Sequence, residues 1–425
     1  MTYKIYTLGC KVNEYESEVM ADLLFNAGYE KSDNPDICII NTCTVTNTAD
    51  SKSRKLIRSL KRKYPTAIIV VVGCLIQNHV DTIDDLDIDI ALGNKDKSKI
   101  VQYLNNYKNA KISKLYNIDE MDFENMILNN SDLTRAYIKI QDGCDNYCAF
   151  CIIPYVRGHV RCKKREDVVK EAKNLIEKGH KELVLTGIHT GSYHDGKYDF
   201  SDLLSDLVKL DGLDRLRISS IEITELNDKF LNILKSSNVL TNHLHIPLQS
   251  GSDFILKSMN RKYDIDYFKK KIKKIRQIRP NINITTDVIV GFPGETDKMF
   301  LETIKTIKKI GFTKLHVFPY SKREGTVAAS MENQIDSKVK KERVKQLLKL
   351  SHELEVVYMK KFLNKEMTFI PEIYKDGYLI GHTENYLLIK AKGKEKKLRE
   401  SLTIYTEQLE YPYIIGKISE LEAIK

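Results

Sequence analysis

The sequence predicts an α/β protein in three parts: an N-terminal doubly wound parallel sheet, a central partial (β/α)6 barrel, and a small C-terminal antiparallel β-barrel. Three observations predict this architecture. Apolar runs alternate with helix-like stretches over residues 4–93, a second alternating series covers residues 136–319, and the tail from about Lys365 consists of short β-rich segments. We place the three domains at residues 1–115, 130–362 and 363–425.

The N-terminal series contains four predicted strands with helical patterns between them. The strands are KIYTLG, DICIINT, AIIVVVG and DIDIALG, at residues 4–9, 36–42, 67–73 and 87–93, and the helices are at 14–27 and 48–63. Because the apolar runs are nearly continuous, we expect a parallel sheet that is covered on both faces. Residues 112–133 are acidic and have no clear period, which predicts a linker.

The central series contains six predicted strands, at residues 136–141, 182–186, 216–220, 243–247, 282–290 and 314–319. Helical patterns lie between them, for example at 166–178, 266–278 and 299–310. A complete barrel of this kind has eight strands, so six predict an open barrel. A long amphipathic helix at about 337–362 leads out of it.

The tail is rich in short β segments that are separated by Gly, Asn or Asp. The segments are EMTFIPEIY, YLIGHT, NYLLIKA and PYIIGKI, and they predict a small antiparallel barrel. Residues 364–425 hold ten acidic and ten Lys or Arg side chains. This neutral tail offers no long-range attraction to a polyanion.

Composition limits the class of protein. The chain has 425 residues, a formal net charge of +10 and only 8 cysteines, far fewer than a secreted disulfide scaffold would carry. The N-terminal residues lack a signal-peptide pattern, and the longest apolar run, at residues 67–76, is too short to cross a bilayer. We expect a cytoplasmic protein of a reducing compartment, with no membrane partner and with charge that permits an RNA partner.

The strongest motif is Cys144-x3-Cys148-x2-Cys151, which follows the first strand of the central series. Three thiolates on one short loop suit a 4Fe-4S cluster with one iron left open to a small molecule. A zinc site is the alternative, because His159 or Cys162 could supply the fourth ligand that structural zinc requires. A disulfide is a weaker interpretation, since the number of cysteines is odd.

A second set consists of Cys10, Cys43 and Cys74, each of which follows an apolar strand. The carboxyl ends of parallel strands meet at one edge of a sheet, so these thiols are expected to converge as a second three-thiolate cluster site. The alternative is buried structural cysteine, a frequent role for this residue. We assign that structural role to Cys38, inside its strand, and to Cys162.

Four residues near the predicted mouth of the barrel are candidates for binding a polar ligand. They lie at or beyond strand ends and are Gly187, Glu222, Gln249 and Arg261. Each could equally be an ordinary surface residue. The GFPGET turn at residues 291–296 could cradle a ligand or simply connect a strand to a helix.

Basic residues concentrate at 52–63, where seven of twelve are Lys or Arg. On a helix they would form a positive face that could contact phosphates, or an ordinary solvated face. Three aromatic residues flank the cysteine loop, and they could stack on a base or only pack the loop. These are Tyr147, Phe150 and Tyr155.

These motifs together resemble a known family. The first cysteine motif with GFPGET resembles the radical S-adenosylmethionine (radical SAM) enzymes, and LGCKVNEYESE, NTCTVTNTAD and VVGC narrow the resemblance to the methylthiotransferases, from Tyr6 to about Lys417. LGCKVN with NTCTVTNTAD is most similar to the branch that acts on N6-threonylcarbamoyladenosine in tRNA. Lys11, Val12 and Asn13 carry much of that distinction. The tail is similar to the RNA-binding TRAM module.

The resemblance implies a role for each candidate residue. Cys144, Cys148 and Cys151 would hold the 4Fe-4S cluster that binds S-adenosyl-L-methionine, and Cys10, Cys43 and Cys74 would hold a second 4Fe-4S cluster that carries the sulfur. Pocket positions for the cofactor would be Gly187, Glu222, Gln249 and Arg261. The partners would be tRNA, a reducing electron donor and a sulfur donor that the sequence does not identify.

The implied reaction attaches a methylthio group to adenine C2, whose C–H bond is too weakly acidic for a side-chain base. One S-adenosylmethionine would donate the methyl group, and reductive cleavage of another would activate C2. Alternative substrates are isopentenyladenosine in tRNA and an Asp of a ribosomal protein. A non-catalytic, zinc-stabilised RNA-binding protein is the alternative of a different class. Arg161 is followed by Cys162 and Lys163, where relatives often have Ser and Arg, so the resemblance assigns that stretch no role.

Overall fold

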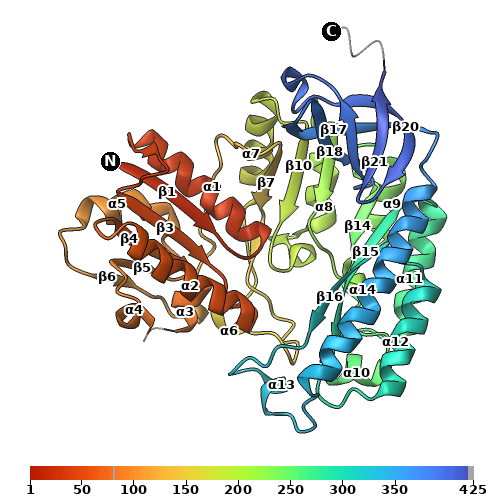
Figure 1. Cartoon of the computed structure of the whole chain (residues 1–425), viewed down its shortest axis with the longest axis horizontal. Helices are drawn as coiled ribbons and strands as arrows, with labels where there is room; N and C mark the ends of the chain where they lie inside the picture. The colour runs from red at the N-terminus through yellow and green to blue at the C-terminus, as the bar shows by residue number, and fades with distance from the viewer. Residues whose placement is uncertain (80–81, 420–425) are drawn as a thin grey trace.

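The computed structural model describes residues 1–79 and 82–419 and begins with a parallel six-stranded sheet in the order β2-β1-β3-β4-β5-β6 (Figure 1). The strands are β1 (Thr2–Thr7), β2 (Glu30–Lys31), β3 (Ile37–Thr42), β4 (Ile68–Gly73), β5 (Ile90–Leu92) and β6 (Ile112–Lys114). The predicted doubly wound sheet is confirmed. Strand β6 lies in the predicted linker; three residues are too few to show a period, and only pairing with β5 reveals it.

Both faces of this sheet are buried. Helices α1 (Lys11–Asn26) and α5 (Ile100–Asn106) contribute to one core, and α2 (Asn47–Lys63) contributes to the other. Alternate residues of each strand point to opposite cores, as Ile39 and Ile40 of β3 do. This two-sided burial is the reason why the strands read as continuous apolar runs.

The central part has the six predicted parallel strands, arranged as two three-stranded sheets, β13-β10-β7 and β14-β15-β16. Their bounds are β7 (Arg135–Lys139), β10 (Glu182–Thr186), β13 (Arg215–Ile218), β14 (His243–His245), β15 (Asn283–Val290) and β16 (Lys314–Pro319). A backbone bridge between Leu216 and Leu240 links the two sheets. The predicted open barrel is therefore confirmed.

Amphipathic helices cover the outside of this barrel. They are α7 (Arg165–Glu177), α8 (Phe200–Leu207), α9 (Asp228–Ser236), α11 (Ile265–Ile278) and α12 (Asp297–Ile310). Short β8 (Gln141–Asp142) and β9 (Arg161–Cys162) pair after β7. The outward residues Ala136 and Ile138 join the main core with these helices, so the alternate, polar residues of the strands face the barrel interior.

Helix α14 (Ser337–Lys360) packs along β16 and leads to a closed barrel of β17 (Glu366–Lys375), β18 (Tyr378–Thr383), β19 (Leu388–Lys392), β20 (Leu402–Glu410) and β21 (Tyr413–Ile418) (Figure 1). All its pairs are antiparallel except β19 with β21, so the predicted barrel is confirmed with one parallel pair. Residues 420–425 of the predicted third domain lie outside the described residues.

The C-terminal barrel is docked on the central one through buried arginine. Arg215 of β13, which is 4% exposed, donates to the carbonyl oxygens of His382 and Thr368, both at 2.9 Å. Such bonds occupy backbone acceptors that would otherwise face solvent. Over residues 1–79 and 82–419, no helix has the length and apolar character that a bilayer span requires.

Candidate active site

The loop with Cys144, Cys148 and Cys151 lies between β8 and the short helix α6 (Ile153–Arg157), beyond the carboxyl end of β7. The loop contains a turn in which the Cys151 N–H donates to the Cys148 carbonyl at 2.9 Å. Burial raises the pKa of the Cys151 thiol to about 12, and the charges of Cys148 and Cys144 raise it further. The three thiols are therefore electrostatic neighbours.

Arg261 and Glu222 meet at this loop. The Arg261 guanidinium, 4% exposed, donates to the Cys148 sulfur at 3.2 Å and forms an ion pair with Glu222. Burial raises the pKa of the Cys148 thiol, and Arg261 opposes that rise by favouring the thiolate. Of the four predicted pocket residues, Arg261 thus contacts the cysteine loop, and Glu222 is paired with Arg261.

Gly187 lies where the strand β10 ends, and a side chain there would collide with its neighbour. A Cβ atom would come within 2.9 Å of the Gln141 side-chain oxygen and 3.2 Å of the Gln141 carbonyl oxygen. That same side-chain oxygen accepts the His189 N–H at 2.7 Å. Gly187 therefore lets β8 and the loop after β10 approach each other.

His189 is a site residue that the sequence analysis missed; it lies in the sequence GIHTGSY, at residues 187–193, directly after β10. Its imidazole forms an ion pair with Glu225 and is an electrostatic neighbour of the Cys144 thiol. Burial lowers the pKa of His189, but Cys144 and Glu225 overcome this effect and raise it to about 10. One histidine in a loop has no spacing signal, so only the fold identifies it.

Gln249 lies beside β15, whereas the GFPGET turn is tied to α14. Gln249 has a φ of 65° and is bridged to Val288 of β15, at the end of the strand series. In the turn, the Glu295 carboxylate accepts from Gly291 N–H at 2.6 Å and pairs with Arg343 of α14 at 2.6 Å. The turn is thus held by the ion pair between Glu295 and Arg343 of α14. This contact favours the interpretation that the turn simply connects a strand to a helix.

The second set of cysteines meets at the carboxyl edge of the N-terminal sheet. Cys10 precedes α1, Cys43 follows β3, and Cys74 starts α3 (Cys74–Asn78) directly after β4. Burial raises the pKa of the Cys43 thiol to about 11, and the charges of Cys74 and Cys10 add to the rise. Gly9, with φ 114°, permits the contact, because its Cβ would lie 2.9 Å from Cys43 Cβ.

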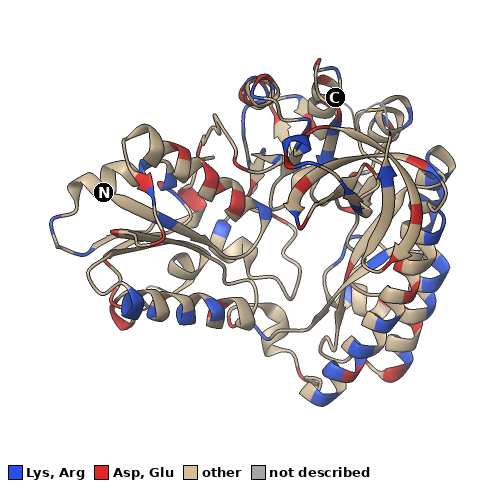
Figure 2. Cartoon of the chain, turned by 45° about the horizontal axis from the view of Figure 1, so that its top comes forward, with Lys and Arg blue, Asp and Glu red and all other residues tan. Residues whose placement is uncertain are grey.

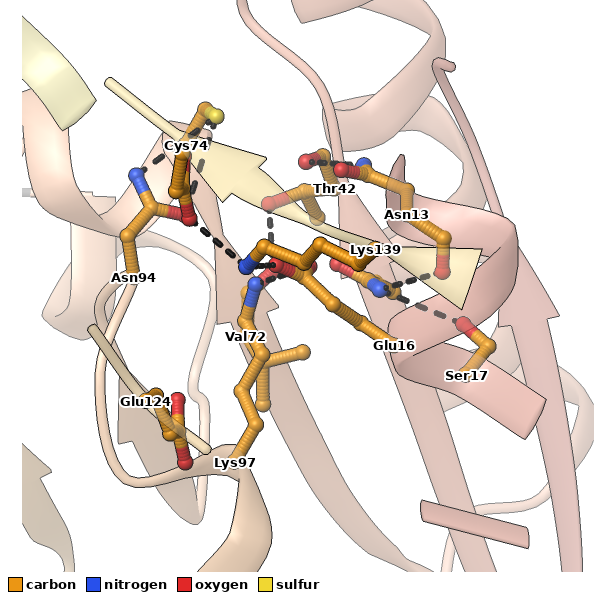
Figure 3. Close-up of polar contacts among 12 residues, drawn as sticks. Asn13, Glu16, Ser17, Thr42, Val72, Cys74, Asn94, Lys97, Glu124 and Lys139 are labelled. Carbon is orange, nitrogen blue, oxygen red and sulfur yellow. Dashed lines mark hydrogen bonds and ion pairs between the residues drawn. The ribbon is translucent and has the colours of Figure 1, made fainter. Parts of the chain in front are cut away.

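Two buried asparagines hold the loops that carry these thiols. Asn13 donates to the carbonyl oxygens of Leu8 at 2.6 Å and Thr42 at 3.0 Å, the residues that precede Gly9-Cys10 and Cys43. Asn94 contacts the Cys74 sulfur at 3.6 Å (Figure 3). Asn13 therefore fixes the backbone beside Cys10 and Cys43, and Asn94 contacts the sulfur of Cys74. Neither asparagine is itself a candidate for binding a cluster.

A buried ionic network connects the two cysteine sets. Glu16 of α1 pairs with Lys97, with Lys139 at 2.8 Å and with Arg157 at 3.3 Å, and all four side chains are at most 2% exposed (Figure 3 shows the lysines). Asp142 accepts from Lys139 at 2.6 Å and from Arg157 at 3.0 Å. Three cations thus face two carboxylates in a water-poor interior, where charges require partners.

The excess positive charge of this network lies toward the second cysteine set. Burial opposes the charge of Arg157, but Asp142, Cys74, Glu16 and Cys10 together hold the pKa of its guanidinium well above the ordinary value. Its second amino group donates to Asn13 Oδ1 at 2.9 Å. Arg157 therefore lies between the first cysteine loop, which it follows, and the second set.

No three His, Cys, Asp or Glu side chains in residues 1–79 and 82–419 converge as closely as one metal ion requires. In a 4Fe-4S cluster each thiolate binds a different iron, so its ligands stand further apart than the ligands of a single ion.

Cys38 is buried in β3 within the core, and Cys162 lies in β9, 3.8 Å from His194 Nδ1.

The basic stretch at 52–63 forms most of α2, and its ribbon carries Lys and Arg at successive turns (Figure 2). Together with the loop before α13 (Val327–Ser330), it lines a groove between the N-terminal and central parts. The basic residues of this groove are Arg54, Lys55, Arg58, Lys322 and Arg323. Arg54 and Arg323 are paired with Asp50, whereas Lys55, Arg58 and Lys322 extend from the surface of the groove.

The open parallel barrel with three cysteines on the loop after its first strand defines a radical SAM enzyme, and comparison supports this class: residues 138–307 match the Radical SAM superfamily. Residues 2–93 match a family described as "Uncharacterized protein family UPF0004". Relatives of more than 30% identity over nearly the whole chain, given below, show the particular family. The chain belongs to the radical SAM methylthiotransferases and is a transferase.

Two relatives illustrate the similarity. The threonylcarbamoyladenosine tRNA methylthiotransferase MtaB of Bacillus subtilis is 42% identical, over 98% of this chain and 96% of the relative. A tRNA-2-methylthio-N(6)-dimethylallyladenosine synthase of Clostridium perfringens is 33% identical, over 98% of this chain and 97% of the relative. The predicted resemblance to the family is confirmed, and the non-catalytic zinc-protein alternative is wrong.

Among solved structures, the chain resembles the radical S-adenosylmethionine methyltransferase TsrM of Kitasatospora setae, with a TM-score of 0.56. The identity is 12%, and the match covers 75% of this chain and 72% of TsrM. At this identity the likeness concerns the fold. Membership of the radical SAM superfamily implies one 4Fe-4S cluster and S-adenosylmethionine as cofactors.

Proposed function

We propose that this enzyme attaches a methylthio group to C2 of N6-threonylcarbamoyladenosine in tRNA. The observation that carries the proposal is the 42% identity, over nearly the whole chain, to a relative named for this reaction. Relatives from Thermotoga maritima, Chlamydia pneumoniae and Aquifex aeolicus, at 38%, 37% and 35% identity, bear the same name. The dimethylallyladenosine synthases, at 33% to 34%, favour isopentenyladenosine as the second candidate.

Cys144, Cys148 and Cys151 would hold the cluster that binds S-adenosylmethionine. The fit is chemical: three neighbouring thiols lie on one loop, and the buried Arg261 guanidinium contacts one sulfur, which lowers the cost of a buried thiolate. When bound by these three thiolates, a 4Fe-4S cluster would leave one iron open to S-adenosylmethionine and would supply the reducing power for cleavage of the sulfonium.

Cys10, Cys43 and Cys74 would hold a second 4Fe-4S cluster, the site from which sulfur is delivered. The support is the electrostatic proximity of the three thiols and the buried cation beside them, since a cluster with three thiolates is an anion that requires compensation in a water-poor site. Arg157 supplies this positive charge, and Asn13 and Asn94 hold the ligand loops in place.

The residues around the two clusters would bind and orient the cofactor and the tRNA, and they would exclude water. Glu222, Arg261, Gly187 and Gln249 would form the cofactor pocket: the Glu222–Arg261 pair offers hydrogen bonds to the polar end of the cofactor, and Gly187 lets the loop after β10 pack against β8. The basic groove with Lys55, Arg58 and Lys322 would contact tRNA phosphates.

The test is anaerobic reconstitution followed by iron and sulfide analysis. The wild-type chain is expected to hold about eight irons, and Ala variants of either triad about four. Cys38→Ala and Cys162→Ala are matched controls and should keep the wild-type content. If the triple Ala variant at Cys10, Cys43 and Cys74 still transferred the methylthio group, the second cluster site would be wrong.

The substrate is tested by nucleoside profiling of tRNA from cells with and without the gene. We expect 2-methylthio-N6-threonylcarbamoyladenosine to disappear with the gene and to return with the wild-type copy. If the methylthio form of isopentenyladenosine disappeared instead, the substrate would be isopentenyladenosine, the second candidate.

A further inference from the structure

The interior of the central barrel contains a cluster of cations directly beside the start of α1. Glu182 of β10 accepts from Arg217 at 2.7 Å and from Arg215 at 3.5 Å, both on β13. Arg135 of β7 pairs at 3.0 Å with Glu372 of the C-terminal barrel. All these residues of the central part come from interior-facing positions of adjacent strands, so the cluster is part of the barrel wall.

Lys11 is the first residue of α1, and α1 packs against β7, the strand that carries Arg135. Burial lowers the pKa of its ammonium group, Tyr386 opposes the change, and Arg135 and Arg217 reinforce it. Within residues 1–79 and 82–419, no carboxylate forms an ion pair or hydrogen bond with this group. Lys11 is thus a half-buried cation that faces other cations, and Glu182, the carboxylate that acts on it, is already paired with Arg217 and Arg215.

The cluster as a whole has an excess of positive charge. Its four cations are Lys11, Arg135, Arg215 and Arg217, and its three carboxylates are Glu182, Glu372 and Glu384. His243 does not add charge, because burial and the neighbouring Arg217 hold its pKa well below the ordinary value. At least one positive charge therefore lacks a partner, and buried charges are normally paired.

Two polar atoms beside Lys11 also lack partners. Arg217 is 1% exposed and His243 is 6% exposed, yet Arg217 Nη1 and His243 Nδ1 have no hydrogen bond to any described residue. His243 Nε2 contacts Thr285 at 3.2 Å, so its other nitrogen is the free one. Buried polar atoms without partners are rare in folded proteins and point to a bound group.

The ring of Tyr386 holds this arrangement rigid. It stacks on His243 at 4.8 Å and on His382 at 4.4 Å, and the guanidinium groups of Arg217 and Arg135 lie over it at 4.7 and 5.3 Å. Because Tyr386 belongs to the C-terminal barrel, that barrel forms one wall of the cluster. Preorganised guanidinium groups bind planar anions such as carboxylates well.

The sequence segment Lys11-Val12-Asn13 leaves only one side chain for a ligand. Val12 and Asn13 are each 1% exposed; Val12 is in the core, and Asn13 holds the loops of the second cysteine set. A threonylcarbamoyl group is joined through the threonine nitrogen and therefore keeps a free carboxylate, whereas a dimethylallyl group is uncharged and apolar. A cation without a partner attracts the carboxylate of the threonylcarbamoyl group but gains no partner from the dimethylallyl group, so it can distinguish the two.

We propose that Lys11 and Arg217, together with His243, bind the carboxylate of the N6 substituent on the target base and so select an anionic substrate over an apolar one. This inference rests on the proposed function and assigns the residues that recognise the N6 substituent of its substrate. The matching of a buried positive charge to a substrate anion gives discrimination, because the apolar substrate would leave the cations unpaired.

The test uses reconstituted holoenzyme and three anticodon stem-loop RNAs. One carries N6-threonylcarbamoyladenosine, the second carries its carboxamide analogue, and the third carries N6-dimethylallyladenosine. Binding is measured by fluorescence anisotropy, and methylthiolation by mass spectrometry of nucleosides. We expect the wild type to bind the carboxylate RNA at least about tenfold more tightly than the carboxamide RNA.

Lys11→Met should abolish that preference by weakening only the carboxylate RNA, with a raised KM and a nearly unchanged kcat. Lys11→Arg should restore it, and Lys308→Met, at an exposed lysine of α12, should leave it intact. Equal iron content in all variants shows that the fold is kept. Arg217→Met provides an independent variant with the same expected loss.

Two results would overturn the inference. Either the wild type binds the carboxylate and carboxamide RNAs equally, or Lys11→Met and Arg217→Met both retain the full preference. Failure of the proposed function has a different signature: iron-replete wild type would modify the dimethylallyl RNA and leave the threonylcarbamoyl RNA unmodified, and this result would also reject the carboxylate site.

Discussion

The Arg157 guanidinium donates to both carboxylate oxygens of Asp142 at 3.0 Å, and this buried pair closes the loop that carries Cys144, Cys148 and Cys151. Asp142 stands two residues before the first of these cysteines and Arg157 six residues after the last. Arg157 also reaches Glu16 and Asn13 of α1. The pair therefore ties the first cysteine loop to the helix that follows Cys10.

Replacement of Arg157 should destabilise the protein strongly. Arg157→Met leaves Asp142 and Glu16 short of a buried cation, a loss that costs about 3–5 kcal/mol of unfolding free energy. Anaerobic urea unfolding measures it, and iron analysis should show loss from the second cysteine set. The control is Arg165→Met, which removes a solvent-accessible pair with Asp206 and should cost far less, because accessible ion pairs contribute little to stability. Equal losses in both variants would contradict the role of Arg157.

Glu18 predicts a pH dependence of stability. Its Oε2 is buried without a partner among the described residues, and burial raises the pKa of the carboxyl to about 7. The unfolded chain loses this proton near pH 4.3, so between about pH 4.3 and 7 the folded state holds more protons and stability falls as pH rises. Glu18→Gln removes this penalty.

Urea unfolding at two pH values checks the Glu18 prediction. The stabilisation of Glu18→Gln over the wild type should be about 2 kcal/mol larger at pH 8 than at pH 5. Glu30→Gln, at an exposed position, should show no such difference. A stabilisation that is the same at both pH values would mean that the carboxyl is not held protonated.

The basic groove predicts how salt affects tRNA binding. Ala replacement of Lys55, Arg58 and Lys322 should weaken binding to tRNA and reduce the slope of log K against log salt by about 1 for each phosphate that is no longer neutralised. Fluorescence anisotropy at several salt concentrations gives the slope. Ala replacement of three α12 lysines, Lys305, Lys308 and Lys309, changes the net charge equally and should leave the slope nearly unchanged. Equal slopes in the two triple variants would reject the groove.

The contacts of Arg215 predict that the stability of the C-terminal barrel depends on its attachment to the central barrel. Arg215→Met removes donors from the carbonyl oxygens of His382 and Thr368, each worth about 1–3 kcal/mol when left buried and unpaired. Hydrogen exchange in β17 and β18 should become faster than in β21, which pairs with neither of these two strands. Lys314→Met, which breaks an exposed pair with Glu355, should not change the exchange. Unaltered exchange in Arg215→Met would show that other contacts hold the barrel.

Much of the fold was predictable because its signals are local. Continuous apolar runs mark strands buried on two faces, and alternating helices require parallel crossover connections, so β3, β4 and β15 fell within a residue or two of their predicted positions. Strands of two or three residues, such as β6 and β9, have no period of their own. They exist because a neighbouring strand pairs with them.

The sequence by itself determined the class of chemistry: the spacing of Cys144, Cys148 and Cys151 and the position of Cys10, Cys43 and Cys74 after strands are properties of the linear chain. Only the tertiary structure decided what surrounds them. Arg157, His189 and the meeting of Lys11 with Arg217 join residues up to about two hundred positions apart. Burial and charge pairing depend on distance in space, which no pattern along the chain records.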